Sequence, residues 1–313
     1  MIRHIARRLL LAIPTLLAVF TIIFIIVRIA PGDPAVAALG DYASAEAVAS
    51  LRERMGLNEP LWKQYVIFLG DLARGDLGRS LISERPVSEQ IGFVLPYTLE
   101  LTIAATLFGL LFGIPTGVIT AIRRNTSIDY AGRVLSLLGL SFPSFYLGIL
   151  LMFFFAVRLG LFPSVGSAPF SEPGRNLHYL VLPAVTLGLI ETAYIARMTR
   201  SVVLNILSDD YIRTARAKGL QEQVVLVRHA LRAALIPIVS LIGIFAISLI
   251  GSSVLVEEVF ARPGLGKLMV GATKQKDYTT LQSIMVVYAL LIVVINLITD
   301  IVYTYVDPRV RYD

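Results

Sequence analysis

Residues 209–237 read DDYIRTARAKGLQEQVVLVRHALRAALIP, a charged segment between two long apolar stretches. The segment is too polar to cross a bilayer, yet its Ala, Arg and aliphatic residues recur at helical spacing. Its two leading aspartates suit the first turn of a helix that Ser208 can cap, and Gly219 suits the left-handed residue at a helix end. We predict a short helix, a turn at Gly219 and a second helix that continues to Pro237.

The composition indicates a membrane protein. Hydrophobic residues make up 56% of the chain and charged residues only 16%, and the mean hydropathy is +0.75, whereas average proteins are about one quarter charged. A helix needs roughly 20 apolar residues to cross the core of a bilayer. We therefore predict an all-α membrane protein of six transmembrane helices, with both termini on the same side. The predicted spans are about 9–29, 98–122, 134–157, 179–197, 235–256 and 283–306.

The basic residues orient these spans, because short cytoplasmic loops carry an excess of Lys and Arg. Arginines precede the first predicted span, lie between the second and third, and crowd residues 209–237. All three groups fall on one side, so we predict that both termini and the segment 208–237 are cytoplasmic. This bias accounts for the net charge of +6. We therefore predict the lipid bilayer, and no nucleic acid, as the partner of these charges.

Residues 30–96 are predicted to form a small helical domain outside the cytoplasm, because a loop of this length is translocated largely regardless of its charge. Ser44 can cap one helix that ends near Gly56, and a second amphipathic helix ends at Gly75. Trp62 and its aromatic neighbours either pack on the membrane domain or form a docking surface for an external partner. The predicted divisions are 1–29 (N-terminus and first span), 30–96 (extracytoplasmic domain), 97–306 (transmembrane core with the segment 208–237) and 307–313 (cytoplasmic tail).

Two features are expected to shape the spans themselves. Gly109, Gly113 and Gly117 recur every four residues in the second span, a pattern that lets helices approach closely. Pro143 interrupts the hydrogen bonds of the third span, so this place either bends for packing or lines a pathway. We expect a tight helix contact at the glycines.

Glu191 is the clearest charge at membrane depth, because it lies within the fourth predicted span. A carboxylate in the bilayer core is costly unless it is paired or reached by water. Two roles stay open for this residue. It forms a structural ion pair with an arginine such as Arg197, or it lines a translocation pathway.

Enzymatic chemistry is not predicted. The sequence has no cysteine, its three histidines are scattered, and it contains neither an H-E-x-x-H nor a G-x-S-x-G motif. Residues 264–268 imitate a phosphate-binding loop, but Ala261 stands where a Walker A motif needs Gly, and Leu268 stands where it needs Ser or Thr. We predict that the chain is not an enzyme, has no catalytic or metal-binding residues and binds no cofactor of its own.

The stretch 210–220, DYIRTARAKGL, with His229-Ala230-Leu231-Arg232 and Ile236-Pro237 after it, resembles the cytoplasmic coupling loop of permease subunits in bacterial ABC importers. It is closest to the dipeptide, oligopeptide and nickel branch. The general importer loop begins Glu-Ala-Ala, and Arg213 and Thr214 stand at the first two positions here, as in that branch. The resemblance extends over nearly the whole chain through PGDP (31–34), GDLG (75–78), TLEL (98–101), SFP (141–143), RPGLG (262–266) and DPRVRY (307–312).

The resemblance implies alternating access powered by other chains. A second, homologous permease would complete the pathway, two cytoplasmic ATPases would bind ATP and Mg, and an extracytoplasmic solute-binding protein would deliver the cargo to the bacterial inner (plasma) membrane. Ile212, Ala215 and Gly219 form a small-residue edge that we expect to enter an ATPase groove. The implied ATPase-coupling residues are Tyr211, Arg213, Thr214, Ala215, Arg216, Ala217, Lys218 and Gly219, and the implied binding-protein docking residues are Trp62, Gly75, Asp76 and Gly78.

The cargo that the resemblance implies is a dipeptide or oligopeptide. Nickel chelates, glutathione and oligosaccharides are alternatives for the same machinery. An ion-coupled secondary transporter, with Glu191 as its titrating group, is the alternative from a different class of protein.

Overall fold

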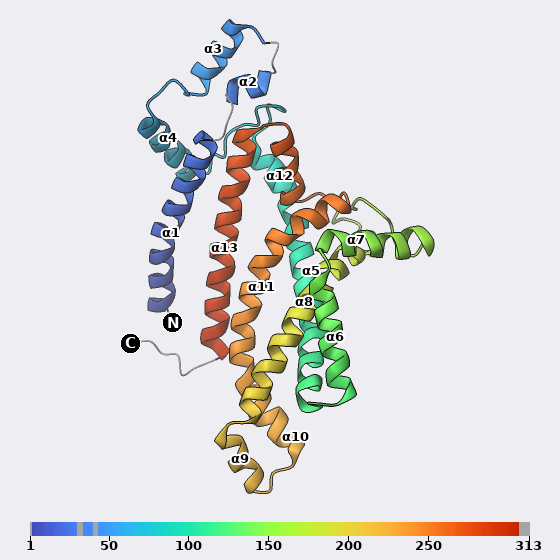
Figure 1. Cartoon of the computed structure of the whole chain (residues 1–313). Coiled ribbons are helices and arrows are strands. Elements are labelled where there is room, and N and C mark those ends of the chain that lie inside the picture. Colours follow the sequence, from blue (N-terminus) through green and yellow to red (C-terminus); the bar gives the residue numbers. More distant parts are fainter. Residues whose placement is uncertain (1, 30–33, 40–42, 307–313) are drawn as a thin grey trace. The chain divides into compact units, whose positions relative to one another are not determined.

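The computed structural model describes residues 2–29, 34–39 and 43–306, and these residues form helices and turns without a β-strand (Figure 1). The all-α prediction is confirmed. The tail 307–313 and residues 31–33 lie outside the described residues. The helices are α1 (Ile2–Ile29), α2 (Pro34–Leu39), α3 (Ala45–Arg54), α4 (Leu61–Ala73), α5 (Val87–Ile122), α6 (Ser127–Ser141), α7 (Ser144–Leu151), η1 (Met152–Arg158), α8 (Pro173–Leu207), α9 (Asp210–Ala217), α10 (Glu222–Val224), η2 (Val225–Leu231), α11 (Arg232–Val259), α12 (Leu265–Lys274) and α13 (Tyr278–Val306).

The chain divides into two compact units. Unit 1 consists of Met1–Pro96 and Pro263–Val294, and unit 2 consists of Tyr97–Arg262 and Ile295–Asp313. Helices α5 and α13 each contribute residues to both units. Residues 263–294, which the sequence analysis assigns to the transmembrane core, group with the N-terminal part of the chain.

Five helical stretches of the described chain are long and apolar enough to cross a membrane, and a sixth is added if α6 and the α7–η1 segment count as one span. The structure thus gives five or six candidate spans where the sequence predicts six. The five are Leu10–Ile29, Val87–Ile122, Pro173–Leu207, Glu222–Val259 and Tyr278–Val302.

The third predicted span, 134–157, is interrupted next to Pro143, as the proline predicts, so it is not one straight helix. α6 ends at Ser141, and the α7–η1 segment that follows is bent by 102° relative to it. Phe142, between the two helices, has an extended backbone with ψ of 130°. Pro143 explains the break, because a proline disfavours the helical conformation in the residue before it and has no N–H to donate.

α8 is the central helix of unit 2. It packs against α6, α7 and α11, and 61% of its apolar window is buried. This burial sets it apart from the other candidate spans, in which only 17–28% of the apolar stretch is buried. The core cluster that includes α8 contains Leu101, Ala105, Leu180, Leu182, Ala184, Leu187, Leu249, Val256 and Phe260.

The close helix contact predicted for the glycines of α5 is confirmed. A Cβ added at Gly113 would lie 2.8 Å from Cβ of Ile195, and one at Gly117 would lie 2.6 Å from the backbone oxygen of Ala196. A Cβ added at Gly109 would lie 2.8 Å from Cγ of Glu191, which belongs to the same helix, α8. Glycine therefore sets the distance between α5 and α8, because a larger residue would push the two backbones apart.

The two short helices predicted within residues 30–96 are confirmed as α3 and α4 of unit 1. Ser44 caps α3, since its Oγ accepts a hydrogen bond from the backbone N of Ala47 at 3.2 Å. Gly56 and Gly75 follow the two helices with φ of 65° and 77°, in the left-handed region that glycine enters without strain.

A polar cluster around Asp277 fixes the following segment in unit 1. Ser80 Oγ donates to Oδ2 of Asp277 at 2.6 Å, and the backbone N of Leu81 donates to Oδ1 at 3.2 Å. Thr280 Oγ1 donates to the same carboxylate at 2.7 Å. The turn between α12 and α13 thereby holds the chain just before α5, above an apolar cluster of Val87, Ile91, Val94, Leu265 and Ile284.

Gly117→Ala is expected to lower the free energy of unfolding by roughly 1–3 kcal/mol. The added methyl would face the backbone oxygen of Ala196, which cannot move without shifting α8. Gly92→Ala is the matched control on α5, because no described atom lies within 4 Å of its added Cβ. Thermal unfolding of the purified variants in detergent measures the difference, and equal melting temperatures would contradict the tight α5–α8 contact.

Candidate functional site

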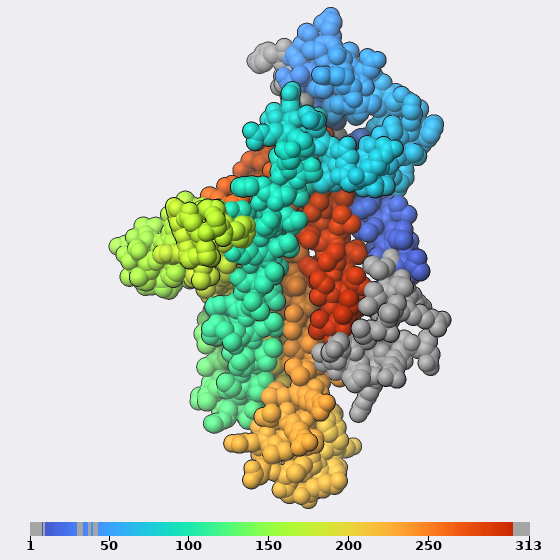
Figure 2. Space-filling model, turned by 180° about the vertical axis from the view of Figure 1, so that it is seen from behind, coloured from blue at the N-terminus to red at the C-terminus, as the bar shows by residue number. Residues whose placement is uncertain are grey.

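The charged segment forms a hairpin at the ends of α8 and α11 (Figure 1, Figure 2). We call residues 209–231 the charged hairpin; it consists of α9, a short turn, α10 and the π-helix η2. The predicted helix, turn and second helix are confirmed. The second helix does not end at Pro237, because η2 continues into α11, which runs through this proline to Val259.

The cap of α9 is Asp209 and not Ser208, so that prediction is wrong. Asp209 has the extended backbone of a cap residue, with ψ of 148°. Ser208 instead ends α8, where its hydroxyl donates to the backbone oxygen of Asn205 at 2.6 Å. α8 extends past the predicted span, so Ser208 belongs to the end of α8 and is not available to cap α9.

The small residues of α9 face the inside of the charged hairpin. Ile212 is fully buried and Ala215 is only 8% exposed. They pack with Val225 and Ala230 of η2, beside Leu207 at the end of α8. The predicted small-residue edge is therefore wrong for Ile212 and Ala215, because the hairpin uses these side chains for its own core.

The outer surface of the hairpin carries the other residues that the resemblance implies in coupling. Tyr211 is 44% exposed, and Leu220 in the turn is 40% exposed. Partial burial, and to a smaller degree the charge of Asp209, raise the pKa of the Tyr211 hydroxyl, which therefore stays protonated. Aromatic and arginine side chains are enriched in protein interfaces. The exposed set is Tyr211, Arg213, Thr214, Arg216, Ala217, Lys218 and Gly219.

The turn of the hairpin is closed by a glycine and an ion pair. Gly219 has φ of 78°, as predicted, and its N–H donates to the backbone oxygen of Arg216 at 2.9 Å. Arg216 also binds Glu222 with two hydrogen bonds, Nε to Oε2 at 3.0 Å and Nη2 to Oε1 at 2.6 Å. This pair raises the pKa of Arg216, so the guanidinium stays charged. The bridge joins α9 to α10 across the turn.

Glu191 is buried in α8, but it does not pair with Arg197. Six residues along an α-helix separate two side chains by about 9 Å and place them on different faces. Arg197 is exposed, and its Cζ lies 5.9 Å from the ring centre of Tyr194. The polar neighbour of Glu191 is Thr106 of α5, yet among the described residues neither group has a partner in hydrogen-bond geometry. The pathway role of Glu191 stays a prediction.

Three of the implied docking residues form a turn in unit 1. Asp76 Oδ1 accepts a hydrogen bond from the backbone N of Gly78 at 2.8 Å. Gly78 has φ of 75°, and a Cβ added to it would lie 2.9 Å from Cγ2 of Thr279. Gly75 has open space around it within the described part of the chain. The turn thus packs on the start of α13, and its contact with another protein stays a prediction.

The fourth docking residue, Trp62, is 69% exposed on α4. The next residues of α4 pack on α1. Tyr65 and Thr21 share a hydrogen bond of 2.6 Å between their hydroxyls, and Arg28 Nε donates to Oε1 of Gln64 at 2.8 Å. Because Thr21 lies within the apolar span of α1, α4 lies alongside that span.

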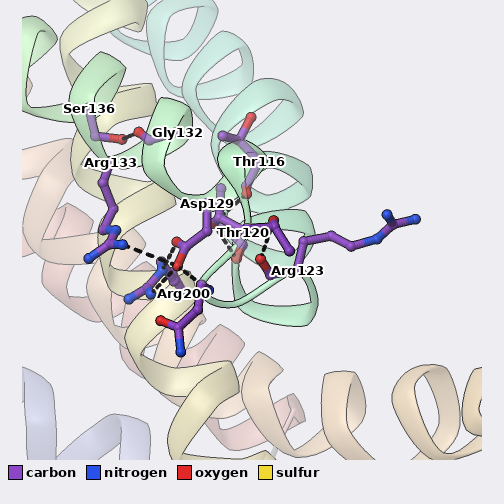
Figure 3. Close-up of polar contacts among 11 residues, drawn as sticks. Thr116, Thr120, Arg123, Asp129, Gly132, Arg133, Ser136 and Arg200 are labelled. Carbon is purple, nitrogen blue, oxygen red and sulfur yellow. Dashed lines mark hydrogen bonds and ion pairs between the residues drawn. The ribbon is translucent and has the colours of Figure 1, made fainter.

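A buried ion pair that the sequence analysis missed joins α6 to α8 (Figure 3). The carboxylate of Asp129 is fully buried and accepts two hydrogen bonds from Arg200, Nε to Oδ1 at 2.7 Å and Nη2 to Oδ2 at 2.9 Å. The sequence contains a signal for this pair, because Asp129 is the single acidic residue among the three arginines of residues 123–133.

Comparison with known families covers almost the whole chain. Residues 113–312 match the family described as binding-protein-dependent transport system inner membrane component, and residues 1–102 match the N-terminal family of the same membrane components. The chain is 40% identical to the dipeptide transport system permease protein DppB of Alkalihalophilus pseudofirmus, with all of both chains covered. It is 41% identical to the glutathione transport system permease protein GsiC of Pectobacterium atrosepticum, again with all of both chains covered.

The fold is similar to that of a solved transporter. A chain of the MetNI methionine ABC transporter, in an inward-facing conformation, matches 70% of this chain and 97% of its own length, with a TM-score of 0.57 and 24% sequence identity. This likeness concerns the fold alone.

Ala215→Glu is expected to disrupt the charged hairpin, whereas Ala217→Glu is expected to leave it folded. Ala215 is buried in the hairpin core and Ala217 is exposed on the same helix. An unpaired buried carboxylate costs about 3 kcal/mol or more, and an exposed one costs little. Hydrogen–deuterium exchange of residues 206–231 measures the effect. Equal protection in the two variants would contradict the inward orientation of Ala215.

Proposed function

Because the chain belongs to the family of binding-protein-dependent transport system inner membrane components, we propose that it forms half of the translocation pathway of an ABC importer for peptides. The observation that carries this proposal is the family match over residues 113–312, which includes the charged hairpin. The chain is a multi-pass protein of the inner membrane. It is a permease and not an ATPase.

The partners of the permease follow from this role. A second, homologous permease would supply the other half of the pathway, and two cytoplasmic ATPases would bind ATP and Mg²⁺. An extracytoplasmic protein would deliver the substrate. Trp62 and the turn formed by Gly75, Asp76 and Gly78 are the proposed contacts with that delivery protein.

The charged hairpin is the proposed contact with an ATPase. Tyr211, Thr214 and Ala217 on its exposed face could pack against the ATPase. Arg213 and Lys218 on the same face could pair with acidic groups of the ATPase. The buried face of α9 packs on the end of α8, and η2 continues into α11 without a break. A displacement of α9 by a moving ATPase would therefore be transmitted to both helices of the pathway.

A peptide is the proposed cargo, because relatives that match the full length of the chain are named as dipeptide and glutathione permeases. Dipeptides and glutathione share amide bonds, an amino group and a carboxylate. The pathway half described here would therefore have to pass a polar solute that carries both an amino group and a carboxylate as charges. Glu191 of α8, buried in the isolated chain, is a candidate for contact with the amino group if the second permease opens a cavity beside it.

Peptide uptake into proteoliposomes tests the function directly. We expect ATP-dependent uptake when this chain is reconstituted with the second permease, the ATPases and the delivery protein of its transport system, and no uptake with this chain alone. An ion gradient should not replace ATP. Uptake by the isolated chain under an ion gradient would sink the importer assignment in favour of a secondary transporter.

Ala217→Glu is expected to lower peptide uptake at least tenfold, because a charge would be placed in the interface with the ATPase and one misplaced interface charge costs several kcal/mol. Membrane insertion and the amount of protein should stay normal. Ala49→Glu, at an exposed alanine of α3, is the matched control. Co-purification of the ATPases, measured together with uptake, separates a lost contact from a failed fold; unchanged co-purification and uptake would rule out this face of α9.

A further inference from the structure

A cavity of about 160 Å³ lies among α5, α6 and α8 of unit 2, next to the buried Asp129. Figure 3 shows the acid between two of the arginines that line the cavity, Arg133 and Arg200, whereas Arg123 points away from it. The polar lining consists of Thr116 and Thr120 from α5, Arg133 and Ser136 from α6, and Arg197 and Arg200 from α8.

The cavity carries an excess of positive charge. Three arginines are among its lining residues, and one carboxylate, that of Asp129, lies beside them, which leaves two positive charges. The carboxylate binds Arg200 with two short hydrogen bonds and also accepts one from the backbone N of Asn125 at 3.0 Å. Asp129 is therefore largely used in fixing Arg200, and it compensates the other two arginines poorly.

Arg133 and Arg197 are the incompletely matched cations. Nη2 of Arg133 lies 3.5 Å from Oδ2 of Asp129, and among the described residues neither Nη2 nor Nε has a hydrogen-bond partner. Arg197 makes no ion pair with a described residue; it packs on the ring of Tyr194. Buried donors without acceptors are costly. An anion in the cavity would supply acceptors for Nε and Nη2 of Arg133 and would also meet the charge of Arg197, which is exposed.

Two of the three hydroxyl groups of the cavity, those of Thr120 and Ser136, do not compete for this role. Thr120 Oγ1 donates to the backbone oxygens of its own helix at 2.8 and 3.0 Å, and Ser136 Oγ donates to the backbone oxygen of Gly132 at 2.8 Å. Their protons are thus occupied, and the two arginines remain as donors for a ligand together with the hydroxyl of Thr116.

The cavity lies near one end of the long helices α5 and α8. Thr116 lies six residues, or about 9 Å, before the end of α5. The end of α5 lies at the same level as the end of α8, because Ala121 packs with Val203. The cavity is thus on the side of unit 2 that carries the charged hairpin.

An apolar surface continues from the cavity. Leu137 of α6 lines the cavity and is 59% exposed, and its neighbours Val134, Leu135 and Leu138 are 54%, 68% and 50% exposed. A ligand with a phosphate and an acyl chain could place the charge on the arginines and the chain along these residues. A small inorganic anion would contact only the arginines.

We propose that this cavity binds the phosphate of an anionic phospholipid through Arg133 and Arg197, with Asp129 and Arg200 holding the site open. The guanidinium fork of arginine matches the geometry of phosphate oxygens and can bind two of them at once. Basic pockets between transmembrane helices are a known mode of anionic-lipid binding. The proposal does not depend on the transported cargo. Lipid binding can therefore fail while the transport function stands, and the transport function can fail while lipid binding stands.

Native mass spectrometry of the full chain, purified with its co-expressed partner subunits from membranes, tests the proposal. After exchange into nanodiscs of phosphatidylcholine with a fraction of phosphatidylglycerol, we expect phosphatidylglycerol to be retained on the wild type. Arg133→Gln combined with Arg197→Gln should retain about tenfold less, since two charged contacts are lost. Arg123→Gln combined with Arg124→Gln is the control of equal charge, and it should behave as the wild type.

Two outcomes would overturn the proposal. Equal retention by both double variants, whether high or low, would mean that the cavity arginines have no specific role. Displacement of phosphatidylglycerol by millimolar inorganic phosphate, with phosphate bound in its place, would assign the site to a free anion and not to a lipid. If the glutamine variant unfolds, Arg133→Lys decides instead: it keeps the charge and loses the fork, and unchanged retention would contradict the assigned contact.

Discussion

The close approach of α5 and α8 is the constraint on which unit 2 depends. In lipid, apolar side chains gain nothing by moving against one another, so helices associate through tight packing and polar contacts. Gly113 and Gly117 bring the two backbones together, and Gly132 repeats this contact from α6, where an added Cβ would lie 2.3 Å from Cγ2 of Thr120. With three helices held at these distances, Asp129 of α6 can reach Arg200 of α8.

Local patterns predict most of the helical elements. Apolar runs of span length and the polar segment 209–237 are visible without knowledge of the packing, and the structure has helices in all of these places. The orientation of short helices is different, because an amphipathic pattern gives two faces without saying which one meets the rest of the protein. Ala215 therefore turned out to be buried, although its helix is short and polar. Likewise, Pro143 signals an interruption, but its 102° bend depends on tertiary packing.

Charged partners are the least predictable part, because proximity in sequence is a poor guide to proximity in space. Glu191 and Arg197 are six residues apart and point in different directions, whereas Asp129 and Arg200 are 71 residues apart and share two hydrogen bonds. Only the arrangement of α6 beside α8 brings the second pair together. A lone acid among arginines at the end of a span is the pattern that could have suggested it.

The bridge between Arg216 and Glu222 makes the charged hairpin a preassembled block, with its turn closed at Gly219 and its core filled by its own side chains. Binding to such a surface costs less conformational entropy than binding to a loop that becomes ordered only in the complex. Recognition can then rest on a few contacts, and release requires no unfolding. A surface of this kind suits an association that forms and breaks repeatedly, since each event begins from the same shape.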